Sequence, residues 1–135
     1  MSLRDIAVRV EASPASRIGG IRPILHEIRT LLAALIDTGR GGSIDLRSLP
    51  LSPADFEALD AALGEGEVRA TIRALGETRV TETAIHGVWR VTHCNDGGEA
   101  VADLIEVCDA PEILKTHAAD ARVGLAKLRT RLEPG

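Results

Sequence analysis

The segment GVWRVTHCNDGG, residues 87–98, brings a thiol, an imidazole and a carboxylate close together in the chain. A cysteine beside a histidine is the pairing that activates a thiolate nucleophile, and a nearby carboxylate can orient the imidazole. The same segment is also typical of a β-strand that runs into a tight turn. Because neighbouring residues on a strand point to opposite faces, His93 and Cys94 cannot aim at one reacting atom. The segment therefore does not predict a catalytic site.

Metal binding is the second chemistry that these residue types allow, since imidazole and thiolate are both ligands of zinc and related metals. No His or Cys in the chain has a CxxC, HxxxH or HExxH spacing. Ligands distant in sequence can still converge in a fold. A metal- or cluster-handling site built from His86, His93 and Cys94 therefore stays open as an alternative, although we expect no resident metal or cofactor.

The turn at Asp96-Gly97 indicates how the hairpin pairs. Asp-Gly is the typical sequence of a two-residue type I′ turn. In that register Trp89 faces Leu104, and Arg90 faces Asp103 as a cross-strand ion pair. We expect Asp96 to bond the backbone within the turn. We also expect the face that carries Trp89 to be the core face, and Cys108 to lie too far from Cys94 for a disulfide.

Hydrophobic periodicity predicts the elements around this hairpin. Pro23 and Gly39 bound one helix, and Ser52 with Pro53 begins a second that ends at Gly64. A capping box of Asp109 and Glu112 indicates the start of a last helical region. Strands are predicted over 5–11, 43–47, 67–75, 79–86, 87–94 and 99–108.

The last helical region has an apolar stripe at helical spacing and a basic C-terminal end. The stripe consists of Ala121, Leu125, Leu128 and Leu132. Together these elements predict an α+β fold, an antiparallel meander of about four to five strands packed on one face by two to three helices. We expect an N-terminal strand and linker over 1–21 and a single domain over 22–135.

Composition excludes several classes of function. The chain has 135 residues, of which 44% are hydrophobic, and a net charge of −4. No basic cluster or set of aromatic side chains indicates nucleic-acid binding. No apolar run is long enough to span a membrane, and the first residues lack the apolar core of a signal peptide. We therefore expect a cytoplasmic protein that binds neither nucleic acid nor membrane.

Five short motifs, taken in order, carry a family resemblance: SIDLRSLPLSP, LGEGEV, GVWRVTHCN, LIEV and APEIL. Together they resemble the HupH/HyaF-type hydrogenase expression and formation proteins, over about residues 23–132. The resemblance implies relatives that are longer, with further sequence ahead of this region.

The resemblance implies an accessory function in the maturation of [NiFe]-hydrogenase. Such proteins act as chaperones of the hydrogenase small-subunit precursor before cluster insertion and export, and a companion of thioredoxin-like fold is often involved. The resemblance supplies no catalytic residues, and a small enzyme is the least favoured alternative. The residues that carry motifs or could contact a partner are Asp45, Leu46, Glu67, Trp89, Arg90, His93, Asn95, Glu106, Pro111 and Leu114.

We expect a partner to dock on an exposed edge of the sheet or on the face opposite the helices. A homodimer is a further arrangement that the sequence leaves open.

Overall fold

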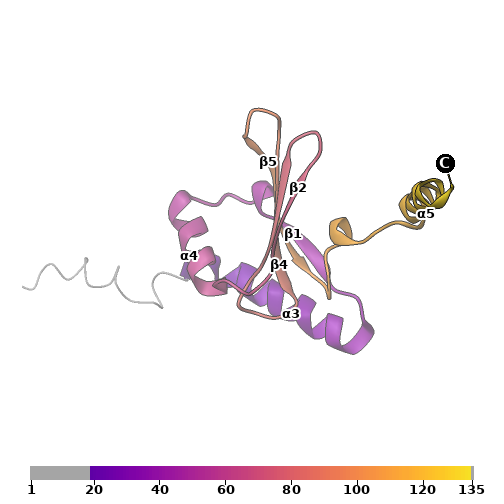
Figure 1. Cartoon of the computed structure of the whole chain (residues 1–135). Helices are drawn as coiled ribbons and strands as arrows, with labels where there is room; N and C mark the ends of the chain where they lie inside the picture. Colours follow the sequence, from indigo (N-terminus) through magenta and orange to yellow (C-terminus); the bar gives the residue numbers. More distant parts are fainter. Residues whose placement is uncertain (1–18, 135) are drawn as a thin grey trace, which may run out of the picture.

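A computed structural model describes residues 19–134 as a five-stranded antiparallel sheet with three α-helices (Figure 1). The strand order is β1-β5-β4-β3-β2, so that β2 to β5 form a meander and β1 pairs with β5. The strands are β1 (Gly42–Asp45), β2 (Arg69–Arg73), β3 (Glu77–Glu82), β4 (Val88–Cys94) and β5 (Ala100–Val107). The predicted α+β meander is confirmed. The predicted strand at 5–11 lies outside the described residues.

The α-helices are α3 (Arg22–Thr38), α4 (Pro53–Leu63) and α5 (Ala118–Leu132), and none in the described part of the chain is long and apolar enough to cross a membrane. A short 3-10 helix, η1 (Gly19–Ile21), directly precedes α3, and two more, η2 (Leu46–Ser48) and η3 (Glu112–Leu114), lie between a strand and the next α-helix. The predicted strand at 43–47 is shorter than expected, because η2 begins at Leu46.

The first two α-helices begin and end at the signals in the sequence. Pro23 occupies the first turn of α3, and Gly39 ends that helix in the left-handed region with φ 77°. At α4 the Ser52 side chain accepts a hydrogen bond from the Asp55 amide, and the Asp55 side chain accepts one from the Ser52 amide. This reciprocal capping box satisfies two amides that the helix itself leaves without partners.

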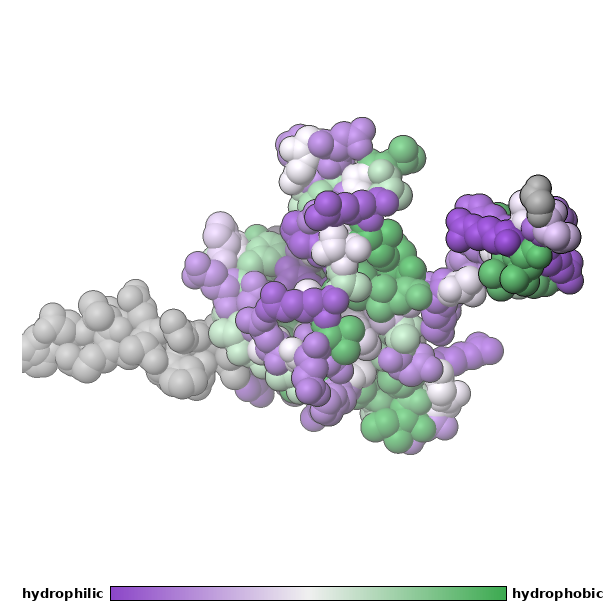
Figure 2. All heavy atoms as spheres, in the orientation of Figure 1, coloured by the Kyte–Doolittle hydropathy of each residue, from purple (hydrophilic) through white to green (hydrophobic). Residues whose placement is uncertain are grey.

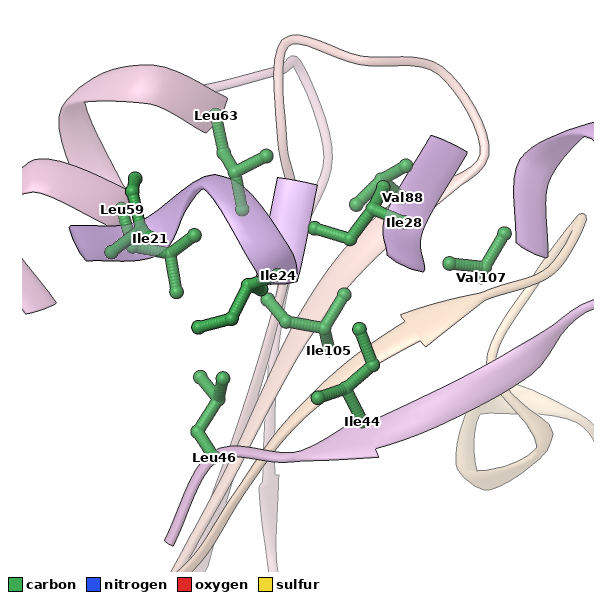
Figure 3. Close-up of a cluster of buried hydrophobic side chains, with 10 residues drawn as sticks. All are labelled: Ile21, Ile24, Ile28, Ile44, Leu46, Leu59, Leu63, Val88, Ile105 and Val107. Atoms are coloured by element: carbon green, nitrogen blue, oxygen red, sulfur yellow. The ribbon is translucent and has the colours of Figure 1, made fainter. Parts of the chain in front are cut away.

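Helices α3 and α4 cover one face of the sheet, and the main core lies between them (Figure 3). The core is aliphatic and joins the helices to the strands through Ile105, which is fully buried. Its buried members are Ile21, Ile24, Ile28, Ile44, Leu46, Leu59, Leu63, Val88, Ile105 and Val107.

A smaller cluster lies on the opposite face of the sheet, where Val80, Trp89 and Val91 are buried. The Trp89 indole N–H donates a hydrogen bond to the carbonyl of Cys108, at 3.2 Å. The expectation that the Trp89 face is the core face was therefore wrong in one respect. This face is buried at its centre, but the helices cover the other face, to which Val88 and Ile105 belong.

The predicted register of the β4–β5 hairpin was also wrong. Trp89 pairs with Glu106 and Val91 pairs with Leu104, and a β-bulge follows His93. The loop has three residues, because Asn95 pairs with Glu99 and Gly98 adopts φ 82°. A three-residue loop ending in a left-handed glycine is a common alternative to the two-residue turn.

Arg90 ties helix α4 to the middle of the sheet. Its guanidinium donates to both carboxylate oxygens of Asp103, at 2.7 and 2.8 Å, and to Asp60 on α4 at 2.5 Å. It also lies 5.9 Å from the centre of the Phe56 ring. The predicted ion pair of Arg90 with Asp103 is thus present. It is diagonal, however, because Asp103 pairs with Thr92 and not with Arg90 in the ladder.

The C-terminal region differs most from the prediction. Residues 109–114 do not begin a long helix, since only η3 forms there and no side chain caps it. Helix α5 starts at Ala118 and has no buried residue. Figure 1 shows α5 apart from the sheet and from the other two helices. Two helices, not three, therefore build the core.

We predict that Asp103→Ala destabilises the fold by about 2 kcal/mol, because it leaves a largely buried guanidinium without its bidentate partner. Arg90 and Asp103 side chains are 18% and 15% exposed. Urea unfolding measures the effect. Glu65→Ala is the matched control, since its pair with Arg69 is exposed and contributes about 0.5 kcal/mol or less. Equal effects of the two variants would contradict this role of Arg90.

We predict that Leu59→Ala lowers the free energy of unfolding by about 2–5 kcal/mol, whereas Leu128→Ala changes it by less than about 0.5 kcal/mol. Leu59 is fully buried in the main core, and Leu128 on α5 is 55% exposed. Thermal and urea unfolding compare the two leucines directly. A large loss for Leu128→Ala would show that α5 packs against the core in solution.

Candidate partner-binding surface

The exposed apolar side chains of the described residues gather in the C-terminal arm, which we define as residues 112–134. Of eleven large hydrophobic side chains that are exposed, six lie in this arm. Single exposed leucines are common on protein surfaces, but a cluster of them indicates an interaction site. The six are Ile113, Leu114, Val123, Leu125, Leu128 and Leu132.

Helix α5 presents three of these side chains, Leu125, Leu128 and Leu132, on one side. On the side of α5 that is visible in Figure 2, hydrophobic residues gather on one flank and hydrophilic residues lie beside them. Leu125 and Leu128 are 48% and 55% exposed, and Leu132 is 75% exposed. An isolated helix of this length is marginal in water, and packing of an apolar stripe is its usual source of stability. The stripe of α5 therefore lacks the contact that such a stripe normally makes.

The charge of α5 differs in sign from that of the whole chain. The helix carries four basic side chains, Arg122, Lys127, Arg129 and Arg131, and one acidic side chain, Asp120. The chain as a whole has a net charge of −4. The arm thus combines an apolar stripe with a local positive field, and such a field selects partners of opposite charge.

The helix-free face of the sheet has a polar border around its buried centre. His93 Nδ1 and Thr78 Oγ1 lie 2.8 Å apart as a hydrogen-bonded pair. Glu106, directly opposite Trp89, is half-buried, and its burial raises the pKa of that carboxyl. His93 and Thr78 are thus bonded to each other, while Glu106 lies beside the buried centre of this face.

The two cysteines of the chain are Cys94 and Cys108, and Cys108 is not placed as an activated nucleophile. Both are free thiols, as the sequence predicted. Burial raises the pKa of Cys108 to about 11, and the nearby carboxylates of Glu106 and Asp109 act in the same direction. A thiol with a raised pKa is protonated at neutral pH and therefore unreactive.

The three residues of the alternative metal site are not brought together. His86 precedes β4, whereas His93 and Cys94 lie at the other end of that strand. His86 lies within 3.5 Å of Glu82, and His93 bonds Thr78. Among residues 19–134 there is no group of three His, Cys, Asp or Glu side chains that could hold a metal ion.

A shallow hollow lies between the tips of the two hairpins, where Arg73 and Arg79 face Cys94 and Asn95. Arg79 is already paired with Glu77, at 3.2 Å. Asn95, not Asp96 as predicted, bonds the loop backbone, because its side-chain oxygen accepts from the Glu99 amide. The hollow is open to solvent and holds no nucleophile–base pair.

Several of the ten predicted site residues have structural roles. The Asp45 side chain accepts a hydrogen bond from the Arg47 amide and so caps η2, while Leu46 is fully buried in the main core. The amide of Glu67 donates to Glu82, which lowers the pKa of the Glu82 carboxyl. Pro111 is fully buried. Trp89, Arg90 and Asn95 hold the fold through the bonds described above, as His93 does through Thr78.

The remaining predicted residues are open to contact. Leu114 is 37% exposed in the arm, and Glu106 is half-buried on the helix-free face. The sequence pattern identified the stripe of α5, and the expectation of two to three helices on the sheet left open whether this helix packs there. Exposed Ile113 and Val123 were not singled out, although the position of Val123 opposite the stripe marks it as exposed.

Comparisons with known proteins place the chain in a family. The model of the HupH hydrogenase expression protein, C-terminal conserved region, matches residues 19–134. HupH, the hydrogenase expression/formation protein of Rhizobium leguminosarum bv. viciae, is 34% identical over 109 residues, which are 81% of this chain and 39% of that protein. HupH of Rhodobacter capsulatus is 36% identical over 109 residues, 76% of this chain and 40% of the relative.

A solved structure shows the same fold. The hydrogenase expression protein HupH from Thiobacillus denitrificans superposes with a TM-score of 0.81 at 41% identity, over 84% of this chain and 95% of that one. The chain spans only about 40% of the length of the two curated relatives, so the longer relatives that the resemblance implied are confirmed. By its sequence and by its fold, the chain belongs to the family of the HupH hydrogenase expression protein, whose C-terminal conserved region it contains.

Proposed function

We propose that the protein is a non-enzymatic accessory factor in the formation of [NiFe]-hydrogenase. It works in the cytoplasm and binds the precursor of the hydrogenase small subunit before cluster insertion and export. Relatives named hydrogenase expression/formation proteins support the maturation role. The family resemblance is the basis for naming the small-subunit precursor as the partner. It is also the basis for a second accessory protein, of thioredoxin-like fold, that would act together with this protein.

One observation carries the binding role: the C-terminal arm exposes an apolar stripe that nothing in residues 19–134 covers. A chaperone needs a surface of this kind, because it must hold an unfinished protein through reversible apolar contacts. The chemistry of the site agrees with binding more than with catalysis. Cys108 is kept protonated, and the His93 imidazole is bonded to Thr78.

We predict that a strain lacking the gene accumulates unprocessed small subunit and has low hydrogenase activity, and that the wild-type gene restores both. The double variant Leu125→Asp/Leu128→Asp is expected to fail to restore them, because two carboxylates disrupt the stripe without entering the core. Immunoblots of the small subunit and hydrogen-uptake assays provide the measurements.

Ile36→Asp is the control for this experiment, since Ile36 is 78% exposed on α3, outside the arm. It should restore processing as well as the wild type does. Normal processing and uptake activity in the deletion strain would refute the proposed function. If the Leu125→Asp/Leu128→Asp variant fully restored processing and uptake activity, the C-terminal arm would have no part in the proposed function.

We also predict that Cys108 reacts with iodoacetamide at pH 8 at least about tenfold more slowly than a small thiol, because a pKa of about 11 leaves little thiolate. Mass spectrometry of the Cys94→Ser variant isolates this reaction. The folded state favours the neutral thiol of Cys108. The contribution of this thiol to the free energy of unfolding is therefore fully present below the ordinary cysteine pKa and falls as the pH rises towards 11. Alkylation at the rate of a free thiol would revive a nucleophilic role for Cys108.

A further inference from the structure

The exposed stripe of α5 has the spacing of a coiled-coil seam. Its members recur at alternating intervals of three and four residues through the whole helix. This alternation is the a/d pattern of a heptad repeat, which gives a narrow seam that suits one neighbouring helix. The seam consists of Ala118, Ala121, Leu125, Leu128 and Leu132.

The residues that flank this seam are basic. With Ala118 at an a position, Arg122 and Arg129 fall at e positions and Arg131 falls at g. The remaining g position within α5 holds Gly124, so no acidic side chain occupies a flank. Side chains at e and g decide which helix can pair with a seam, because they face the flanks of the partner helix.

This charge pattern argues against a second α5 as the occupant. Two copies in antiparallel pairing would place e-position arginines, Arg122 and Arg129, against each other, and like charges oppose association. Two parallel copies would gain no opposite-charge pair at all. The flanks instead complement a helix with glutamate or aspartate at its own e and g positions.

The pattern also argues against a membrane surface. Helices that lie in a membrane interface carry a wide apolar face with Trp or Phe side chains. The seam of α5 has no aromatic residue, and two of its five members are alanines. Val123, the other exposed apolar residue of α5, lies on the opposite side of the helix from the seam and does not widen it.

We propose that α5 is a docking helix that pairs with one amphipathic α-helix of a partner protein, whose apolar seam is flanked by acidic residues. This proposal deepens the proposed function, on which it rests, by stating the chemistry of the segment that the partner presents. Small alanines at the start of the seam and leucines towards its end fit a partner helix that approaches most closely near Ala118 and Ala121.

A peptide-binding experiment on the full chain tests whether α5 pairs with an acidic amphipathic helix. The probe is a designed, fluorescein-labelled helical peptide of about four heptads, with Ile and Leu at a and d and Glu at e and g. The control peptide has the same sequence with Lys in place of Glu at the e and g positions. Fluorescence anisotropy should show saturable binding of the acidic peptide at least about tenfold tighter than that of the basic one. Added salt should reduce the difference.

Substitutions in α5 test the seam itself. Leu125→Asp and Leu128→Asp should each abolish binding of the acidic peptide, whereas Val123→Asp should retain it, because this matched change lies on the other side of the helix. The double variant Arg122→Glu/Arg129→Glu should reverse the preference in favour of the basic peptide. Circular dichroism checks that every variant keeps the fold, which the exposure of α5 leads us to expect.

Four outcomes would overturn the proposal: binding of neither peptide, equal binding of both, loss of binding in Val123→Asp, or no reversal by the charge change. A homodimer in analytical ultracentrifugation that Leu128→Asp dissociates would assign the seam to a second copy. Sedimentation with phosphatidylglycerol vesicles that Leu128→Asp abolishes would assign it to a membrane.

These results are separable from the proposed function. Peptide binding requires no hydrogenase, so it can succeed even if the deletion strain processes the small subunit normally. Conversely, a strain that needs the gene but is fully restored by Leu125→Asp/Leu128→Asp would keep the maturation role and reject the docking helix.

Discussion

The aliphatic core between the sheet and the helices α3 and α4 is the interaction on which the rest of the structure depends. Ile105 and Val107 of β5 and Val88 of β4 meet the helices there. The buried side chains of this core are aliphatic, since the chain has one tryptophan, one phenylalanine and no tyrosine, and their burial is the driving force for this packing. Such burial fixes which face is covered but has little directional preference. Arg90 adds that preference, since its bonds to Asp103 and Asp60 hold α4 at one position over the sheet.

The completeness of this core explains why α5 is left outside it. Two helices cover one face, and on the other face Trp89, Val80 and Val91 are already buried. Leu104 and Ile72 partly cover that second cluster from within the sheet. The sheet therefore gains stability without α5, and the leucines of that helix remain available for an intermolecular contact.

The fold was largely predictable, because its signals are local. Pro23 and Gly39 mark the ends of α3, and the cap at Ser52 marks the start of α4. The register of the hairpin was not predictable, since Asp96-Gly97 suits a two-residue turn while Gly98 allows a three-residue loop. Strand alternation alone still predicted that His93 and Cys94 point to opposite faces. The structural roles of Asp45 and Asn95 depend on hydrogen bonds that no spacing indicates.

The candidate site was visible in the sequence but its role was not, and the reason is physical. Periodicity shows that a helix has an apolar side. It does not show whether that side packs against the same chain or against another protein. The flanking charges carry the missing information. A helix that packed on the acidic body of its own chain would bring its arginines to acidic groups already present, whereas three arginines beside an exposed seam favour a partner helix with acidic flanks. We therefore regard charge at the flanks of a stripe, more than its hydrophobicity, as the feature that separates a docking helix from a core helix in this fold.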